Sequence, residues 1–250
     1  MLGSRRSVDG GRKGLPFGRG GWLGVTDLFR SLDWAPGFAL VRSVFRPSEW
    51  PEVELLGVRG REAAGTRCLL ETPWCRDLAL RVRQHAALAA LIPATHVAVQ
   101  CTYFEKSSTT NWLVSPHQDL NLPVAERVHA QGLRGWSIKE GAHFVLGPPE
   151  VMGQMVAVRL HVDRCHAADG ALRVWPGTHL GGVLDADAMA PDRAEVPEVL
   201  VEADEGDALL MSPLLLHASS KSTSDGRRRV LHFLFGPPAL PQGLRWARAV

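Results

Sequence analysis

The chain has 250 residues, enough to bury a sizeable core, and its 45% hydrophobic and 22% charged residues are typical of a soluble globular protein. A net charge of +2 is too close to zero to indicate nucleic acid or an anionic membrane as a partner. No apolar run approaches the roughly 20 residues of a membrane span, and no compact signal peptide is present, so we expect a cytoplasmic protein. The cysteines form no paired motif, and we expect four free thiols, at Cys68, Cys75, Cys101 and Cys165.

Residues 1–22 are rich in Gly, Arg, Ser and Lys, which predicts a disordered basic tail. The remainder, 23–250, is expected to form a single domain. Its first strands are predicted at 37–41 and 66–70. A helix follows, with Thr72 as its N-cap and Pro73 at its first position, and Pro93 ends it. The apolar positions of this helix indicate a packing role.

From His96 onward the pattern changes to short strands. They are predicted at 97–104, 111–114, 156–162, 171–175, 199–201, 207–211 and 229–235. A turn is expected at Asp169-Gly170, and Glu205-Gly206 indicates a hairpin. This spacing predicts a mainly β (α+β) protein built as a sandwich or barrel, with helices on its N-terminal side.

A metal-binding pattern follows the predicted strand at 111–114. His117 and Asp119 are separated by one residue, so an extended backbone turns both side chains to one face. His217 is the best candidate for a third ligand. Two histidines and one carboxylate form the facial triad of non-haem Fe(II) oxygenases, but the same set also binds zinc. Taken alone, an H-x-D pattern is more often part of a polar core network.

Further motifs in the second half resemble the phytanoyl-CoA dioxygenase (PhyH-like) family of Fe(II)- and 2-oxoglutarate-dependent oxygenases. The order and spacing hold from about residue 96 to 236. The matching pieces are Asn111-Trp112, His117-Gln118-Asp119, Trp136-Ser-Ile-Lys139-Glu-Gly, Asp169-Gly-Ala-Leu-Arg-Val-Trp-Pro-Gly-Thr-His179, Gly206-Asp207, Leu216-His217-Ala-Ser219 and Arg227-Arg228-Arg229-Val-Leu-His. The resemblance implies a double-stranded β-helix, a cupin-like jelly roll, with the N-terminal helices packed on the outside of one sheet.

The resemblance also implies roles for particular residues. His117, Asp119 and His217 would hold Fe(II), leaving positions for 2-oxoglutarate and O2. Arg228, eleven positions after His217, would bind the far carboxylate of 2-oxoglutarate through its planar guanidinium. Other residues expected at this pocket are Ser219 as a hydrogen-bond donor, Gln100 and Thr102 on one strand face, and Trp136 as a wall.

The three consecutive arginines lie at the entry to the last predicted strand. Alternation places Arg228 inside, and we expect Arg227 and Arg229 to lie outside in solvent. His232 shares the Arg228 face, and we expect it to pack. His161 is expected in a polar core network.

We therefore expect a dioxygenase that hydroxylates an unactivated C–H bond of a small organic metabolite and releases succinate and CO2. Related halogenating enzymes have a small residue where this chain has Asp119, so the carboxylate favours hydroxylation or another oxidative outcome over halogenation. The alternatives are a non-catalytic metal-binding β-sandwich and a zinc hydrolase, although the helical H-E-x-x-H pattern is absent from the sequence. We expect a monomer or weak homodimer, and residues 120–153 are predicted to form a lid. The motifs specify neither the substrate, including whether it is a CoA ester, nor the final outcome of the oxidation.

Overall fold

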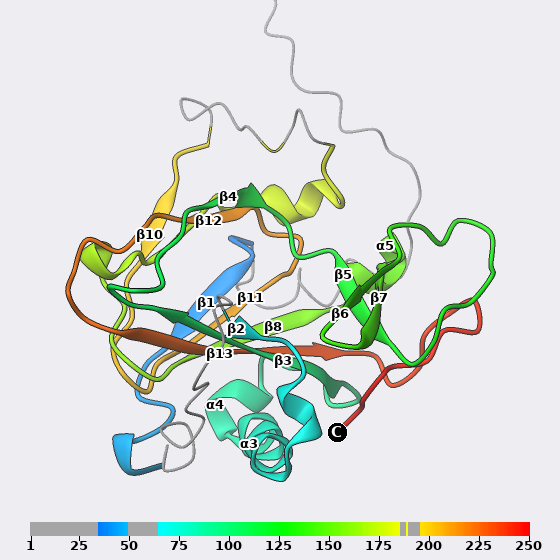
Figure 1. Ribbon diagram of the computed structural model, residues 1–250, viewed down its shortest axis with the longest axis horizontal. Helices are drawn as coiled ribbons and strands as arrows, with labels where there is room; N and C mark the ends of the chain where they lie inside the picture. The colour runs from blue at the N-terminus through cyan, green and yellow to red at the C-terminus, as the bar shows by residue number, and fades with distance from the viewer. Residues whose placement is uncertain (1–34, 50–64, 186–188, 190–195) are drawn as a thin grey trace, which may run out of the picture.

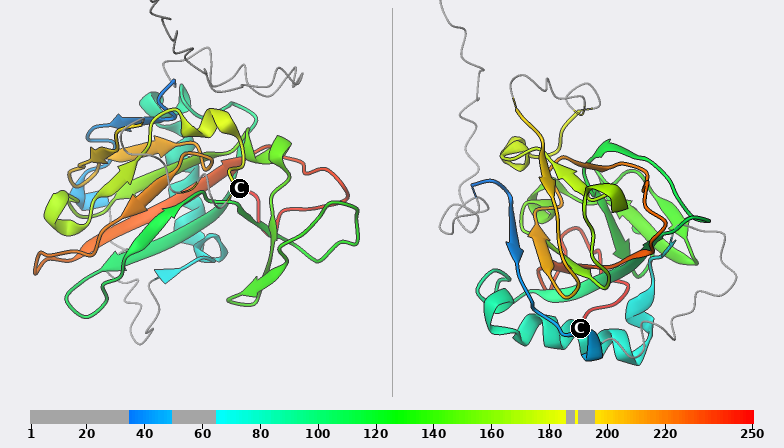
Figure 2. Two further views of the ribbon diagram at one scale, coloured as in Figure 1. Left: turned by 90° about the horizontal axis from the view of Figure 1, so that it is seen from above. Right: turned by 90° about the vertical axis from the view of Figure 1, so that its left-hand side faces the viewer.

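Two antiparallel sheets face each other in the computed structural model, which describes residues 35–49, 65–185, 189 and 196–250 (Figures 1 and 2). The predicted tail at 1–22 lies outside these ranges. Among the described residues, no helix is long and apolar enough to cross a membrane.

The larger sheet has six strands in the order β1-β11-β8-β13-β3-β2, each antiparallel to its neighbour. Its strands are β1 (Phe38–Val41), β2 (Gly65–Thr66), β3 (Val97–Lys106), β8 (Val156–His161), β11 (Ala208–Met211) and β13 (Arg228–Gly236). The long central pair β13–β3 carries side chains of alternating direction, so one face of this sheet turns to the helices and the other to the opposing sheet.

The smaller sheet has the strand order β10-β9-β12-β4 and carries the two predicted histidine ligands. Its strands are β4 (Val114–His117), β9 (Leu172–Val174), β10 (Val199–Val201) and β12 (His217–Ser219). A third sheet, in the order β5-β7-β6, projects from one end of the sandwich (Figure 1). It consists of β5 (Asn121–Val124), β6 (Ser137–Lys139) and β7 (Ala142–Leu146).

Helices α3 and α4 cover the outer face of the larger sheet (Figure 1). The α-helices are α3 (Pro73–Gln84), α4 (Ala86–Ala89) and α5 (Pro149–Met152), and the 3-10 helices are η1 (Pro47–Glu49), η2 (Leu69–Glu71), η3 (Ala167–Asp169) and η4 (Thr178–Gly181). Leu78, Val82 and Leu88 pack with Leu231 and Phe233 of β13 in one apolar cluster. A second cluster lies between the sheets and includes Leu209, Met211 and Val174. This arrangement confirms the predicted jelly-roll class with helices outside one sheet.

Several local predictions need correction. The strand expected at 66–70 is only Gly65–Thr66, because Leu69 and Leu70 enter η2 and join the helix-side core. The helix expected up to Pro93 breaks at His85, whose backbone is extended (ψ 122°). Thr72 stands at the N-cap but its hydroxyl donates back to the carbonyl of Leu69, so it does not cap the helix.

The hairpin expected at Glu205-Gly206 is also wrong. β10 pairs with β9 in the smaller sheet, whereas β11 pairs with β8 and β1 in the larger one. The turn therefore passes the chain from one sheet to the other. The four cysteines are free thiols, as predicted.

Candidate active site

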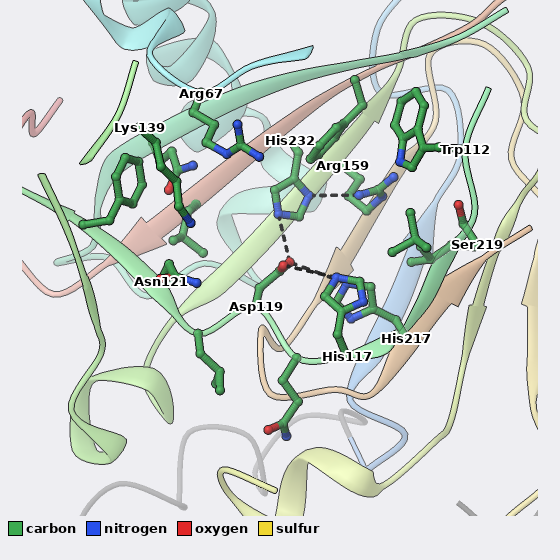
Figure 3. Close-up of a pocket in the computed structure, with 18 of the residues that line it drawn as sticks. Arg67, Trp112, His117, Asp119, Asn121, Lys139, Arg159, His217, Ser219 and His232 are labelled. Atoms are coloured by element: carbon green, nitrogen blue, oxygen red, sulfur yellow. Dashed lines mark hydrogen bonds and ion pairs between the residues drawn. The ribbon is translucent and has the colours of Figure 1, made fainter. Parts of the chain in front are cut away.

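Pairing of β12 with β4 brings the two predicted histidine ligands together. His217 is directly opposite His117, and their ring centroids are 4.2 Å apart. Asp119 follows β4 by two residues, and one ligand atom from each of the three side chains lies within 4.8 Å of the other two. The three predicted metal ligands therefore meet at one point between the sheets (Figure 3).

Backbone carbonyls fix the orientation of both imidazoles. Nδ1 of His117 is 2.9 Å from the carbonyl oxygen of Ser115, and Nδ1 of His217 is 2.8 Å from that of Leu215. Since a carbonyl only accepts, Nδ1 carries the proton and donates it, which leaves a lone pair on Nε2. Each Nε2 is 3.6 Å from an oxygen of Asp119. Two lone pairs and a carboxylate converge as a divalent metal ion requires.

The residue between the ligands anchors the motif. The side-chain amide of Gln118 donates to the carbonyl oxygens of Leu214 (2.6 Å) and Gly182 (2.8 Å) and accepts from the backbone of Leu184. The backbone N–H of Asp119 donates to the carbonyl of Pro213 at 2.9 Å. These contacts tie the segment that carries His117 and Asp119 to the loop before β12.

Burial and mutual charge set the protonation of the ligands. Burial lowers the pKa of His217 to about 4, which favours the neutral imidazole that binds metal. Burial also acts to lower the pKa of His117, but the hydrogen bond and charge of Asp119 outweigh it and raise that pKa. Burial acts to raise the pKa of Asp119, and the surrounding histidines, His217 foremost, nevertheless lower it strongly. Asp119 is therefore ionised.

Two side chains of the larger sheet lie behind the carboxylate of Asp119. Nε2 of His232 is 3.5 Å from Oδ2 of Asp119, and Nδ1 of His232 is 3.3 Å from Nη1 of Arg159 (Figure 3). His232 and Arg159 are opposite each other in the β13–β8 register. Because a guanidinium only donates, Nδ1 of His232 is the acceptor and Nε2 carries the proton toward Asp119. Sequence reasoning assigned His232 to packing and named Arg159 only as a neighbour of His161 in a polar core network; the strand alternation that places both residues inward was the available signal.

The other end of the cavity is strongly cationic. Arg228 is buried beside Lys106 in the β13–β3 register, and Lys106 donates to the hydroxyl of Ser219 at 2.6 Å. Burial, aided by the charge of Arg228, lowers the pKa of Lys106 to about 8. Within the described part of the chain, no carboxylate lies within 4 Å of the guanidinium of Arg228 or Arg159, and Nε of each is buried without a hydrogen-bond partner.

The remaining predicted pocket residues divide into two groups. Ser219 and Gln100 line the cavity, and the amide of Gln100 donates to the hydroxyl of Thr102 at 2.9 Å. Thr102 thus orients Gln100. Trp136, by contrast, packs in the cluster with Val124, Val145 and Leu244 at the third sheet, and it is not among the described residues that line the cavity. Its placement does not support a role as a wall.

Two expectations about the last strand have different outcomes. Arg228, His232 and Leu234 all line the cavity, the alternation that the sequence predicted. Arg229, however, is not solvent-exposed. It is buried and forms two hydrogen bonds with the carboxylate of Asp163, at 2.8 and 2.7 Å.

The side chain of His161 does not join a hydrogen-bond network within the described ranges. Neither of its ring nitrogens has a hydrogen-bond partner among the described residues, although the side chain is buried. The predicted polar network around His161 is therefore wrong.

The cavity around the ligands has a volume of about 350 Å³. Its apolar walls are Phe104, Trp112, Val114, Leu120, Phe144, Leu172 and Leu234. The predicted lid, 120–153, forms the third sheet and α5, and it contributes Leu120, Asn121, Lys139 and Phe144 to the lining.

Comparison with known proteins agrees with this geometry. The family model of phytanoyl-CoA dioxygenase (PhyH) matches residues 62–230. The chain belongs to this family. It is a 2-oxoglutarate-dependent non-haem iron dioxygenase, with Fe(II) and 2-oxoglutarate as its cofactor and co-substrate. Comparison with curated proteins gave no significant sequence match.

Solved structures of similar fold include a non-haem α-ketoglutarate-dependent enzyme and a protein with bound 2-oxoglutarate. AviO1 from Streptomyces viridochromogenes is 22% identical, with 87% of this chain and 95% of that chain covered and a TM-score of 0.57. SnoN, a non-haem α-ketoglutarate-dependent epimerase of nogalamycin biosynthesis, is 17% identical, with coverages of 89% and 84% and a TM-score of 0.59. HygX from Streptomyces hygroscopicus, with nickel and 2-oxoglutarate bound, is 18% identical, with 84% of each chain covered and a TM-score of 0.54. At these identities the likeness shows the shared fold.

Proposed function

We propose that His117, Asp119 and His217 hold Fe(II), that Arg228 and Ser219 bind the far carboxylate of 2-oxoglutarate, and that the enzyme hydroxylates an unactivated C–H bond of a small organic molecule. Succinate and CO2 are the co-products. The observation that carries the proposal is that a two-His, one-carboxylate cluster shares one cavity with buried guanidinium groups that have no carboxylate partner among the described residues.

The donor set fits iron and a keto-acid. Two neutral imidazoles and one carboxylate on one side of a metal leave open positions on the other. Arg228 is buried without a carboxylate partner, and an unpaired buried charge is costly, so a bound carboxylate fits its environment. Ser219 and Lys106 add donors at the same end.

When bound together, iron and 2-oxoglutarate supply the oxidising power, which comes from O2 and the loss of CO2. The protein's own residues do the rest. Arg228 orients the co-substrate, His232 faces one oxygen of Asp119 with its Nε2–H, and the apolar walls exclude water. The amides of Gln100 and Asn121 line the open side, where a substrate would be oriented.

The other two functions explain less of the site. A zinc hydrolase has no use for two buried guanidinium groups beside the metal. A non-catalytic metal-binding sandwich likewise leaves the charges of Arg228 and Arg159 without a purpose. Hydroxylation is our proposed outcome, although SnoN and SnoK are described as an epimerase and a carbocyclase.

The decisive experiment measures succinate formed from 2-oxoglutarate with Fe(II) and O2, using a panel of small metabolites and product analysis by mass spectrometry. We expect succinate to require all three components and the substrate to gain one oxygen atom. Loss of two hydrogens from the substrate, or no net change, would replace hydroxylation by desaturation, cyclisation or epimerisation. Absence of 2-oxoglutarate binding to the iron-loaded protein would contradict the whole assignment.

Variants of the ligands test the metal site separately. His117→Ala, Asp119→Ala and His217→Ala should each abolish turnover and lower bound iron, while circular dichroism stays unchanged. Normal turnover in any one of them would remove that residue from the ligand set.

A further inference from the structure

Two cationic side chains stand at the mouth of the cavity, at the end away from Ser219 and Trp112. Arg67 lies between β2 and η2, and Lys139 is the last residue of β6 (Figure 3). Both belong to the lining of the same cavity as the metal ligands. Neither has a role in holding iron or 2-oxoglutarate as proposed above.

A constrained hairpin holds these two residues near each other. Lys139 pairs with Ala142, so Glu140 and Gly141 form a two-residue turn with positive φ at both positions, 53° and 81°. Positive φ is unusual for a glutamate, and such strain persists only where the surroundings impose it. Here the Glu140 carboxylate accepts hydrogen bonds from the Thr66 hydroxyl (2.5 Å) and the Arg67 backbone N–H (3.0 Å). The turn is thereby docked on the segment that carries Arg67.

The charges at the mouth are not balanced by the protein. Four cationic side chains line the cavity, Arg67, Lys139, Arg159 and Arg228, and Asp119 is its only carboxylate among the described lining residues. Arg67 is 3.5 Å from Glu140, which offsets its charge in part.

Lys139 has no such partner. It makes no hydrogen bond or ion pair with a described residue, and its ammonium lies 5.2 Å from the centre of the Phe144 ring. Desolvation, together with the charge of Arg67, lowers the pKa of Lys139. An anion bound beside Lys139 would offset both effects.

The co-substrate cannot supply that anion. Under the proposed function, its keto-acid end binds the metal and its far carboxylate binds Arg228. Arg228 is opposite Lys106 in the β13–β3 register, Lys106 donates to Ser219, and Figure 3 shows Ser219 across the cavity from Lys139. With metal and co-substrate in place, the mouth still carries two cations. An anionic group from another molecule would offset this charge.

We propose that Lys139 and Arg67 form a second anion site, and that the substrate carries a carboxylate or phosphate group that binds there. This inference rests on the proposed function and specifies its substrate class. The amides of Asn121 and Gln100 lie in the same lining and can donate to the substrate between its anionic group and the metal. Arg67, Gln100 and Phe144 also line an adjoining cavity of about 310 Å³, which offers room for a larger anionic molecule.

The test uses protein loaded with nickel and saturating 2-oxoglutarate, so that no turnover occurs and the Arg228 end is occupied. Benzoate, phenyl phosphate and benzamide are titrated by calorimetry. We expect an anionic probe to bind at least tenfold more tightly than neutral benzamide, and the tighter of the two anions to indicate the substrate's group. Lys139→Met should weaken that binding about tenfold, equivalent to about 1.4 kcal/mol. Lys139→Arg should restore most of it.

A matched control is Arg245→Gln, which removes an exposed cation paired with Glu126. It should leave anion binding unchanged. Equal binding of all three probes, no binding, or anion binding that competes with 2-oxoglutarate would overturn the proposal. Because loading with 2-oxoglutarate is verified first, these results would leave the oxygenase assignment intact, whereas failure to load would contradict that assignment instead.

Discussion

Arg228 differs from its two neighbours in what surrounds its guanidinium. Arg228 lines the cavity, whereas Arg227 is half exposed and 4.0 Å from Glu105. Loss of one partner of a buried charge pair costs about 2–5 kcal/mol in binding. Arg228→Ala should therefore weaken 2-oxoglutarate binding by tens-fold or more, measured by titration with metal saturating. Arg228→Lys should recover only part, because an ammonium lacks the two-pronged geometry.

Arg227→Ala is the matched control, since an exposed ion pair contributes only about 0–1 kcal/mol. It should change 2-oxoglutarate affinity little. Arg229→Ala should instead lower the melting temperature, because the carboxylate of Asp163 loses both hydrogen bonds from the guanidinium and keeps only the one from the backbone N–H of residue 229. A stronger effect of Arg227 than of Arg228 on co-substrate affinity would contradict the assignment.

His232 is a positioning residue for the metal ligand Asp119. Its Nε2–H faces Oδ2 of Asp119 while Arg159 holds Nδ1, so the carboxylate is oriented without a direct contact to metal. Loss of such an outer partner typically costs about 10–100-fold in metal affinity. His232→Phe should show that loss in a nickel titration. His232→Gln, which keeps an N–H donor, should recover part of the affinity; equal affinities for all three proteins would argue against positioning.

At the scale of elements, the long strands could be predicted from sequence and the third sheet could not. β3, β8 and β13 follow clear runs of β-branched and aromatic residues with strong alternation. The β6–β7 turn has Glu140 where such turns favour Asn or Asp, so its local signal is weak. Tertiary contacts to Thr66 and Arg67 hold it, and no local pattern reveals those contacts.

The same distinction applies to the candidate site. His117 and Asp119 were indicated by their one-residue spacing, and His217 was the best candidate for a third ligand. Arg228 came from the family resemblance, and strand alternation then placed it inside. Lys139 and Arg67 come from segments far apart in sequence, and only the docked hairpin brings them to one cavity.

The hairpin β6–β7 should loosen when its docking contact is removed. Glu140→Ala deletes the acceptor for Thr66 and Arg67 and leaves the strained positive φ in place. Amide hydrogen exchange should become faster across 137–146, while β13 in the core keeps its protection. Glu140→Gly relieves the backbone strain but also lacks the carboxylate, so it should show the same faster exchange. Unchanged exchange in both variants would show that the carboxylate does not dock the hairpin.

On the scale of the whole molecule, the larger sheet separates two environments. Its helix-side face belongs to an apolar cluster that includes Val158, Leu160 and Phe233. Its inner face carries Arg159, His161 and His232, all buried. The inner face thus combines part of the second apolar cluster with costly buried polar groups. His161 is the clearest case, because it touches neither the metal ligands nor a hydrogen-bond partner in the described structure.

This burial predicts an acid sensitivity of the metal-free protein. Desolvation, with the charges of Arg159 and Arg228, lowers the pKa of His161 from 6.5 to about 3. Between these two pKa values, His161 is protonated in the unfolded chain but not in the folded chain, so falling pH destabilises the fold. The slope from this one group is about 1.4 kcal/mol per pH unit. At pH 7.5 His161 is neutral in both states, so it adds no pH dependence to the free energy of unfolding.

His161→Leu removes this group and should therefore flatten the loss of stability below pH 6.5. The measurement is the free energy of unfolding in urea at pH 7.5, 6.0 and 5.0, without metal. We expect the difference in unfolding free energy between the variant and the natural protein to grow as pH falls. Leucine also needs no hydrogen-bond partner at this buried position, which favours the variant at every pH. His129→Leu, at an exposed position, is the matched control and should leave the slope unchanged. Parallel pH profiles for His161→Leu and the natural protein would mean that His161 takes up its proton in the folded state, and that the inner face of the sheet admits water.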